Sequence, residues 1–356
     1  MNQAAQNWQP DVLGEHFMSR VLPLSDGQRA TLVRYRPPQP PGGPRRFSLF
    51  HPVPRAPLES VAVLAVHGWS DYFFQRELAE FFGATGAAFY AVDLRNYGRN
   101  LVPTPGEPAL EPGYIDNLSH YAEEFDAALA IIKAEHPDAQ RVLLGHSTGG
   151  LSAALYAAEH PRAVDALVLN SPWLEFQATS YGREALKPLI DAGSFVNPHR
   201  ILPGMDPGIY TRTVNAAQDG EWDYNLAWRP AQGFPLTTGF ISAVLAGQEQ
   251  LAHGLDLPIP VHVLLSARDY LAPRWDARAL SADTALNVRA VAQRALDLGP
   301  RLTISRFDGA LHDIFLSRRP VRTQAYTVTA GWLADVLASG RAERFAGLAR
   351  DVTNNN

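Results

Sequence analysis

The pentapeptide GHSTG at positions 145–149 is the pattern in this chain that is best suited to do chemistry. It lies between an apolar run, 142–144, and a stretch of small residues, 150–154. A serine at a turn from a strand to a helix presents its hydroxyl above the sheet, and glycines flank it because a Cβ would clash in so tight a turn. The five residues alone also fit a turn without chemistry. Their position between a strand and a helix favours Ser147 as a nucleophile.

A serine hydroxyl needs a histidine to accept its proton, and in this arrangement an acid and then the histidine follow the serine along the chain. His312 lies in GALHD, 309–313, after the strand-like run 302–307 and before a helix-like segment at 326–336. A single loop histidine is most often a surface or capping residue, but this one occupies the place that a general base must occupy. We therefore predict that His312 is the base.

Two aspartates, Asp269 and Asp283, follow the strand-like run that ends near Ser266. The chain between acid and base must hold one helix and one strand with short turns, about 30 residues. Asp283 precedes His312 by 29 residues and Asp269 precedes it by 43, and Asp283 leads into the helix-like segment 286–298. The spacing predicts Asp283 as the acid, with Asp269 as the alternative. Either aspartate also fits a role as a cap without chemistry.

Acyl transfer also requires backbone N–H groups that stabilise an oxyanion. One is expected from Thr148, directly after the nucleophile, and a second from the loop after an earlier strand. The segment HGWSD, 67–71, follows the strand-like run 61–66 at that place, so the second predicted donor is the Trp69 amide. His67 is expected to order this loop by hydrogen bonding, because no zinc-type spacing of histidines accompanies it.

Strand-like runs alternate with helix-like segments along the chain, the pattern of a mostly parallel sheet with helices on both faces. Strands are expected at 30–35, 46–50, 61–66, 87–92, 142–144, 166–170, 261–265 and 302–307. The first two flank the Pro-rich segment 37–44 and are interpreted as an antiparallel edge. Apolar residues at helical spacing predict helices at 73–82, 121–132, 286–298 and 326–336, with Asn117 or Ser119 as the cap of the second.

The segment 173–258 separates two parts of this alternating pattern and is too long for a structureless loop. It predicts an inserted cap, or lid, between core parts at 1–172 and 259–340, with 341–356 as a tail. Most of its aromatic residues are expected to form its own core and a few to line a pocket. These aromatic residues are Tyr181, Phe195, Tyr210, Trp222, Tyr224, Trp228, Phe234 and Phe240.

Composition excludes several classes of function. The 356 residues include 31 Lys and Arg against 36 Asp and Glu, a net charge of −5 that gives no electrostatic reason to bind nucleic acid or an anionic membrane. The absence of cysteine excludes disulfides, thiolate metal sites and thiol nucleophiles. Residues 1–23 lack the signal-peptide pattern, and no apolar run approaches the roughly 18 residues of a membrane span. These features predict a soluble, cytoplasmic protein. The chemistry expected of Ser147 and His312 needs neither a metal nor an organic cofactor.

Several motifs together resemble the α/β-hydrolase superfamily, and more closely its serine aminopeptidase-like branch, which includes monoacylglycerol lipases and lysophospholipases. They are VHGWSD at 66–71, DLRNYGR at 93–99, GHSTGG at 145–150 and GALHD at 309–313. The resemblance implies an α/β-hydrolase fold with a mostly parallel central sheet, helices on both faces and an inserted lid. It also implies a Ser-Asp-His hydrolase of carboxylic esters of acyl glycerols or related lipids.

The chain departs from this branch at two places. Asn96 stands where the branch often has glycine, and the segment 267–282 is longer than usual after its strand. The first departure is expected to be neutral. The second leaves the choice between Asp269 and Asp283 to the spacing argument.

Three alternative functions are compatible with this sequence. An aminopeptidase needs carboxylates to hold a substrate ammonium, and the insert offers Glu175, Asp191, Asp206, Glu221 and Asp223, although such charges are more often solvated. An acyltransferase would use the same triad with an alcohol acceptor. A non-catalytic binding protein on a hydrolase fold is the opposing class. The presence of serine, histidine and acid argues against a non-catalytic protein. The predicted binding partner is therefore a substrate, a small-molecule ester or lipid.

Overall fold

The computed structural model describes residues 7–38, 56–102, 110–176, 190, 193–202 and 208–354, with side chains to residue 338. The strands are β1 (Gln9–Pro10), β2 (Phe17–Pro23), β3 (Arg29–Tyr35), β4 (Val61–Val66), β5 (Ala88–Asp93), β6 (Gln140–His146), β7 (Ala166–Asn170), β8 (Val261–Ser266) and β9 (Leu302–Phe307). Within the described residues they form one sheet of order β1-β2-β3-β5-β4-β6-β7-β8-β9.

The sheet is parallel from β5 to β9 and antiparallel at the edge formed by β1, β2 and β3. Strands such as β4, with sequence VAVLAV, are apolar throughout because both of their faces are buried. The antiparallel edge was predicted, but on its outer side β3 pairs with β2, a strand that the sequence prediction did not include. The expected strand at 46–50 lies outside the described residues.

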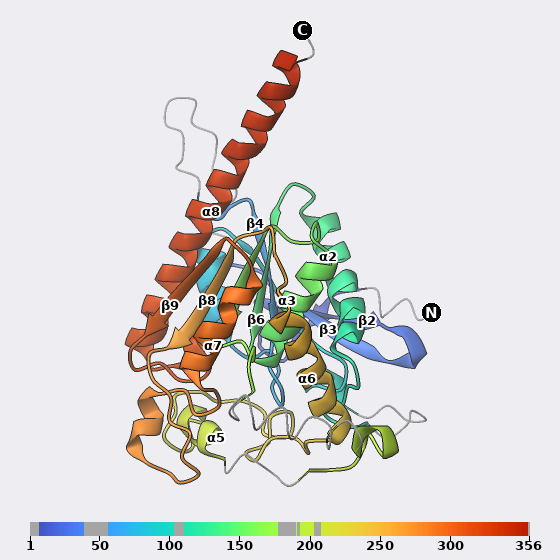
Figure 1. Ribbon diagram of the computed structural model, residues 1–356, viewed down its shortest axis with the longest axis vertical. Coiled ribbons are helices and arrows are strands. Elements are labelled where there is room, and N and C mark those ends of the chain that lie inside the picture. The colour runs from blue at the N-terminus through green and yellow to red at the C-terminus, as the bar shows by residue number, and fades with distance from the viewer. Residues whose placement is uncertain are drawn as a thin grey trace.

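Helices cover both faces of the sheet, as Figure 1 shows. One face carries α1 (Arg76–Ala84) and α8 (Arg319–Asn354), whose apolar residues, such as Phe82 and Leu333, share one core cluster. The other face carries α2 (Ala122–Glu135), α3 (Thr148–Glu159), α6 (Thr238–Ala252) and α7 (Val288–Arg294), which share a second cluster. This three-layered arrangement of helices, sheet and helices confirms the predicted α/β architecture with a mostly parallel sheet.

Short helices complete the elements. Helix α5 (Ile209–Val214) lies at the end of the molecule opposite the C-terminal end of α8 (Figure 1). The segment 341–356, expected to be a tail, continues α8 as far as Asn354. The 3-10 helices are Ser25–Gly27, Gly98–Leu101, Leu118–Tyr121, Ala277–Ser281, Ala295–Leu298 and Ile314–Leu316. Asn117 caps the third of these by accepting a hydrogen bond from the Ser119 amide at 3.0 Å.

The described part of the insert 173–258 is closely joined to the core. Helix α6 packs on α3, and a Cβ added at Gly247 would lie 2.9 Å from Leu155. Apolar residues of α6, including Val244, belong to the same cluster as those of α3. Several aromatic residues of the insert pack with Tyr72 and Phe74 in a third cluster. Tyr181 lies outside the described residues.

His262, in β8, is a fully buried histidine. Its ring packs on that of Trp332 with 4.8 Å between the centroids, and its Nε2 lies 2.9 Å from Ser305 Oγ. Burial lowers the pKa of His262 from 6.5 to about 4. The folded protein therefore keeps this imidazole neutral over a pH range in which the unfolded chain protonates it.

We expect the free energy of unfolding to decrease as the pH falls from about 6.5 to about 4, because the unfolded state then binds a proton that the folded state does not. The pKa of about 4 lies below the value of 6.5 for a free histidine, so this contribution is complete above pH 6.5 and is lost towards pH 4. It amounts to roughly 3 kcal/mol. Urea unfolding at pH 7 and pH 4.5 measures it.

The same measurement on His262→Gln should give a smaller pH dependence. His253→Gln, a change at an exposed histidine, serves as the control and should match the wild type. If His262→Gln loses as much stability between the two pH values as the wild type, His262 is not the group responsible.

Candidate active site

Ser147 lies at a sharp turn between β6 and α3, as predicted. Its backbone has φ 51° and ψ −118°, a conformation that is strained for any residue with a side chain. A Cβ at Gly145 would lie 2.6 Å from the Gly149 carbonyl oxygen, and a Cβ at Gly149 would collide with the His67 carbonyl oxygen. The two glycines therefore let the chain turn tightly enough to present the serine hydroxyl at the carboxyl end of the sheet.

Ser147, His312 and Asp283 form a continuous chain of hydrogen bonds. His312 Nε2 lies 3.0 Å from Ser147 Oγ, and His312 Nδ1 lies 2.9 Å from Asp283 Oδ2. Both His312 and Asp283 are buried. Because the carboxylate accepts the Nδ1 proton, Nε2 carries the lone pair that faces the hydroxyl. This arrangement can remove a proton from Ser147.

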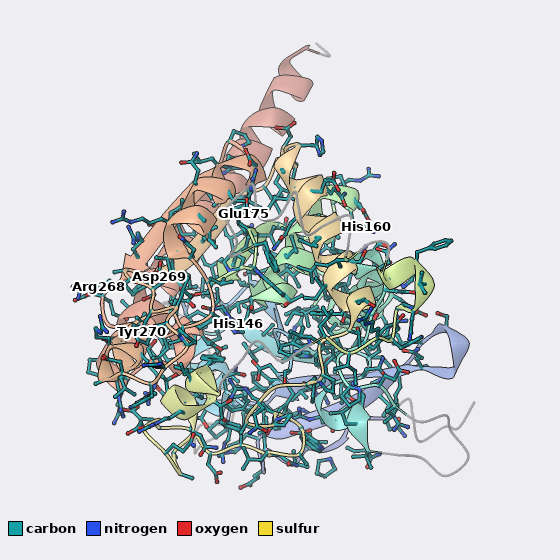
Figure 2. All side chains as sticks on the ribbon, turned by 60° about the horizontal axis from the view of Figure 1, so that its bottom comes forward. His146, His160, Glu175, Arg268, Asp269 and Tyr270 are labelled. Carbon is teal, nitrogen blue, oxygen red and sulfur yellow. The ribbon has the colours of Figure 1, made fainter. Side chains whose placement is uncertain are left out.

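The backbones of Asp269 and Asp283 are paired, but only the Asp283 carboxylate reaches His312. The other carboxylate oxygen of Asp283 accepts hydrogen bonds from the amides of Ala285 and Leu286 at 2.7 and 2.8 Å, which fixes its orientation. Asp269 instead accepts a hydrogen bond from the Val288 amide, at the start of α7, at 3.1 Å. Figure 2 shows Asp269 beside Arg268 and Tyr270, well away from His146. Asp269 therefore has the geometry of a residue that orders the start of α7.

The long segment 267–282 leaves the sheet and returns to it. The Tyr270 amide donates to the Asp283 carbonyl at 2.7 Å, and the Asp283 amide donates to the Arg268 carbonyl at 2.9 Å. The ends of the extra segment are thus tied together, and Asp283 comes back beside the end of β8. Helix α7 begins at Val288, two positions later than predicted, because the Asn287 side chain caps it by accepting from the amide of Ala290.

The loop after β4 is held by His67. Its Nδ1 donates to the Gly68 carbonyl at 2.7 Å, and its Nε2 accepts from the Leu94 amide at 3.1 Å. Burial lowers the pKa of His67, which favours this neutral form. Because the C=O and N–H of a trans peptide point in opposite directions, the Trp69 amide faces away from the His67 ring. Gly68 lies against Ser147, where a Cβ would be 2.9 Å from the serine Cβ.

A buried polar cluster lies behind the nucleophile. Asp71, His146 and Asp313 offer donor atoms within 4.8 Å of one another and are, among the described residues, the group that could hold a metal ion. The Asp313 carboxylate accepts from Asn170 Nδ2 at 2.6 Å, and Asp71 Oδ1 lies 3.0 Å from Arg229 Nε. A metal ion would have to displace the Asn170 amide from Asp313 and lie beside the Arg229 cation, so the cluster is better explained as an internal network of the protein.

Three residues at this site were not predicted from the sequence. Asn170, at the end of β7, also accepts a hydrogen bond from the Ile314 amide at 3.0 Å and so holds the loop of His312. Tyr210 packs edge-on against the His312 ring, 5.3 Å between centroids. Arg229 is the third. Asn170 could have been found as a polar residue that ends a buried strand, and Tyr210 is among the aromatic residues of the insert noted above, whereas nothing in the local sequence marks Arg229.

The carboxylates considered for a substrate ammonium do not form a common site in the described residues. Glu175 is paired with Arg294 at 2.6 Å, and Glu221 is paired with Arg318 at 3.2 Å and with Arg322. Asp223 is exposed. The remaining two, at positions 191 and 206, lie outside the described residues.

Asn96, the other departure from the branch, fits its position. Its φ is 62°, in the left-handed region that asparagine adopts more readily than most residues. Its Nδ2 donates to the Tyr114 carbonyl at 3.2 Å. Asn96 therefore adopts the left-handed backbone conformation at a position where the branch often has glycine.

Comparison with known proteins identifies the family. The family model described as serine aminopeptidase, S33, matches residues 59–317, most of the chain. The chain belongs to this family. The match extends from β4 to the loop of His312 and so includes every motif that carries the resemblance noted above.

Curated relatives match over part of their length. A monoacylglycerol lipase from Mycolicibacterium smegmatis is 29% identical over 157 residues, which is 44% of this chain and 49% of the relative. A human 1-acylglycerol-3-phosphate O-acyltransferase is 33% identical over 91 residues, 25% of this chain and 23% of the relative. The chain therefore matches about half, or less, of the length of these relatives.

Solved structures confirm the fold. A monoacylglycerol lipase from Paleococcus ferrophilus aligns with a TM-score of 0.57 at 18% identity, over 77% of this chain and 94% of its own. A soluble variant of monoglyceride lipase from Saccharomyces cerevisiae aligns with a TM-score of 0.61 at 17% identity, over 92% and 96%. The predicted α/β-hydrolase fold is thus confirmed. In the described part of the chain, no helix has both the length and the apolar character that crossing a membrane requires.

Proposed function

We propose that the protein is a serine hydrolase of carboxylic esters. The observation that carries this proposal is the hydrogen-bonded chain Ser147–His312–Asp283 at a strained turn between a strand and a helix. Ser147 Oγ attacks the ester carbonyl carbon while His312 Nε2 takes the hydroxyl proton. His312 then gives that proton to the departing alcohol, which leaves an acyl group on Ser147. Water, deprotonated by His312, releases the acid and restores the serine.

The amides of Trp69 and Thr148 stabilise the oxyanion of the two tetrahedral intermediates in this proposal. Thr148 N–H is the first amide of α3, where the helix dipole also favours negative charge. The Trp69 amide belongs to the peptide that His67 orients and that lies beside Ser147. Neither role requires a cofactor.

We infer that the substrate is an acyl glycerol or a lysophospholipid-like ester, and that the insert 173–258 acts as a lid that shapes the acyl pocket. The Trp69 ring stacks on Phe240 at 5.9 Å and meets Phe234 edge-on at 6.4 Å, so apolar side chains of the insert lie next to the proposed oxyanion amide. An acyl chain requires such an apolar surface. The relatives named as monoacylglycerol lipases support the same substrate class. The cytoplasmic location expected from the sequence stays a prediction.

A panel of p-nitrophenyl esters of increasing chain length, monoacylglycerols and aminoacyl amides tests the proposed substrate class. We expect hydrolysis of the esters and little of the amides. Phe240→Leu should change kcat/KM for long chains relative to short ones by several-fold, because each buried CH₂ contributes about 0.8 kcal/mol. Phe81→Leu, on the opposite face of the sheet against Tyr326, is the control and should keep the wild-type profile. Identical profiles for the two variants, or a preference for aminoacyl amides, would contradict the proposal.

A further inference from the structure

The loop that follows β4 is attached to the insert at several successive residues. Ser70 Oγ accepts a hydrogen bond from the Phe234 amide at 3.0 Å. Tyr72 Oη accepts one from the Asn225 amide at 2.8 Å. Together with the stacking of Trp69 described above, these contacts join the loop 69–72 to the insert on both sides of Asp71.

Asp71 and Arg229 form a buried ion pair at the centre of this contact. Asp71 and Arg229 are each only 3% exposed, and Arg229 Nε lies 3.0 Å from Asp71 Oδ1. The contact does not have hydrogen-bond geometry, so the two groups interact mainly through their charges. Burial raises the pKa of Asp71, and the charge of Arg229 acts against that shift. Removing one member of such a pair leaves the other as a buried, uncompensated charge.

Arg229 also reaches the other side of the site. Its guanidinium lies over the ring of Tyr210, 5.1 Å from the centroid, and over that of Tyr224 at 4.7 Å. Tyr210 in turn packs edge-on against His312. One side chain of the insert thus contacts the loop of the proposed oxyanion donor through Asp71 and the proposed base through Tyr210.

Another arginine of the insert provides a comparison. Arg212, in α5, lies 3.6 Å from the Trp275 ring centroid and pairs with Asp219, so it makes the same two kinds of contact. Its side chain is 41% exposed, and its partners belong neither to the loop 67–72 nor to the loop of His312. A difference between variants of Arg229 and Arg212 therefore reports on the connection to the site.

We propose that Arg229 is a positioning residue for catalysis. Through Asp71 it holds the Trp69 amide in its reactive position, and through Tyr210 it does the same for the His312 imidazole. This inference rests on the proposed ester hydrolase function. It makes the segment 224–240 of the insert a structural support of the catalytic groups in addition to a wall of the pocket. Without the cation, Asp71 takes up a proton or moves towards water, and the adjoining Trp69 amide shifts with it.

Steady-state kinetics on a p-nitrophenyl ester tests the proposal with Arg229→Met, Asp71→Asn and Arg229→Lys. Loss of an oxyanion donor lowers kcat by about 10²–10³, so a displaced donor should lower kcat by about 10- to 100-fold with KM changed by less than about threefold. Arg229→Met and Asp71→Asn should both show this effect. Arg229→Lys should recover most of the activity, because its ammonium reaches the position of the guanidinium carbon and restores the charge. Arg212→Met should match the wild type.

Amide hydrogen exchange of peptides covering 67–74 gives a second readout that does not depend on activity. Exchange should be faster in Arg229→Met and Asp71→Asn than in the wild type and Arg212→Met. The proposal is overturned if the folded variants keep kcat within twofold of the wild type, if only KM changes, or if exchange of this loop is unchanged. A wild-type protein that neither hydrolyses esters nor reacts with a fluorophosphonate would instead overturn the proposed function, and the exchange comparison would then decide the inference alone.

Discussion

Ser147→Ala should fold normally and lose ester hydrolysis by several powers of ten. Removing the hydroxyl removes the atom that forms the acyl-enzyme, and losses of this size are measured when a member of such a triad is removed. Stability should change little, because alanine and serine have similar difficulty in adopting a φ of 51°. Initial rates on a p-nitrophenyl ester, with thermal unfolding of both proteins, measure the two effects.

Ser119→Ala is the matched control for this substitution. Ser119 is an exposed serine near the start of α2, and its replacement should leave kcat and KM at their wild-type values. If Ser147→Ala retained activity close to that of Ser119→Ala, Ser147 would not be the nucleophile.

Asp283→Asn should be nearly inactive while Asp269→Asn keeps most activity. Asparagine preserves the shape of the acid, but its amide favours the imidazole tautomer with the proton on Nε2, which lowers kcat by about 10⁴ in the serine-protease template. Asp283 Oδ2 lies 2.9 Å from His312 Nδ1, whereas Asp269 Oδ2 accepts from the Val288 amide. Asp269→Asn should therefore cost only some stability of α7.

Each aspartate variant serves as the control for the other. The decisive quantity is the ratio of their kcat values on one ester, measured with folded protein. A ratio near one, or a greater loss in Asp269→Asn, would contradict the assignment of Asp283 as the orienting acid.

The fold and the positions of the site residues could largely be predicted from the sequence because they depend on local patterns and fixed spacings. The turn at Ser147 requires glycines at defined positions, and those glycines are visible in the sequence. The distance from Asp283 to His312 matches one helix and one strand, α7 with its 3-10 extension and β9, which do lie between them. Physical constraints of this kind leave few alternatives.

Other features depend on contacts between distant residues and leave no local signal. Strand β2 combines polar residues with a proline, and its pairing with β3 is decided by the sheet that it joins. The return of the chain at Asp283 depends on hydrogen bonds to Arg268 and Tyr270 across the intervening segment. The pairing of Arg229 with Asp71 joins residues that are far apart in the chain, so neither composition nor spacing could predict it.

Labelling with a fluorophosphonate followed by peptide mapping tests the central claim most directly. The probe reacts with a serine hydroxyl only when a base activates it, with fluoride as the leaving group. The proposed function predicts a single adduct on Ser147, formed in step with the loss of ester hydrolysis and absent from Ser147→Ala. An adduct on another residue, or ester hydrolysis that survives complete labelling of Ser147, would contradict it.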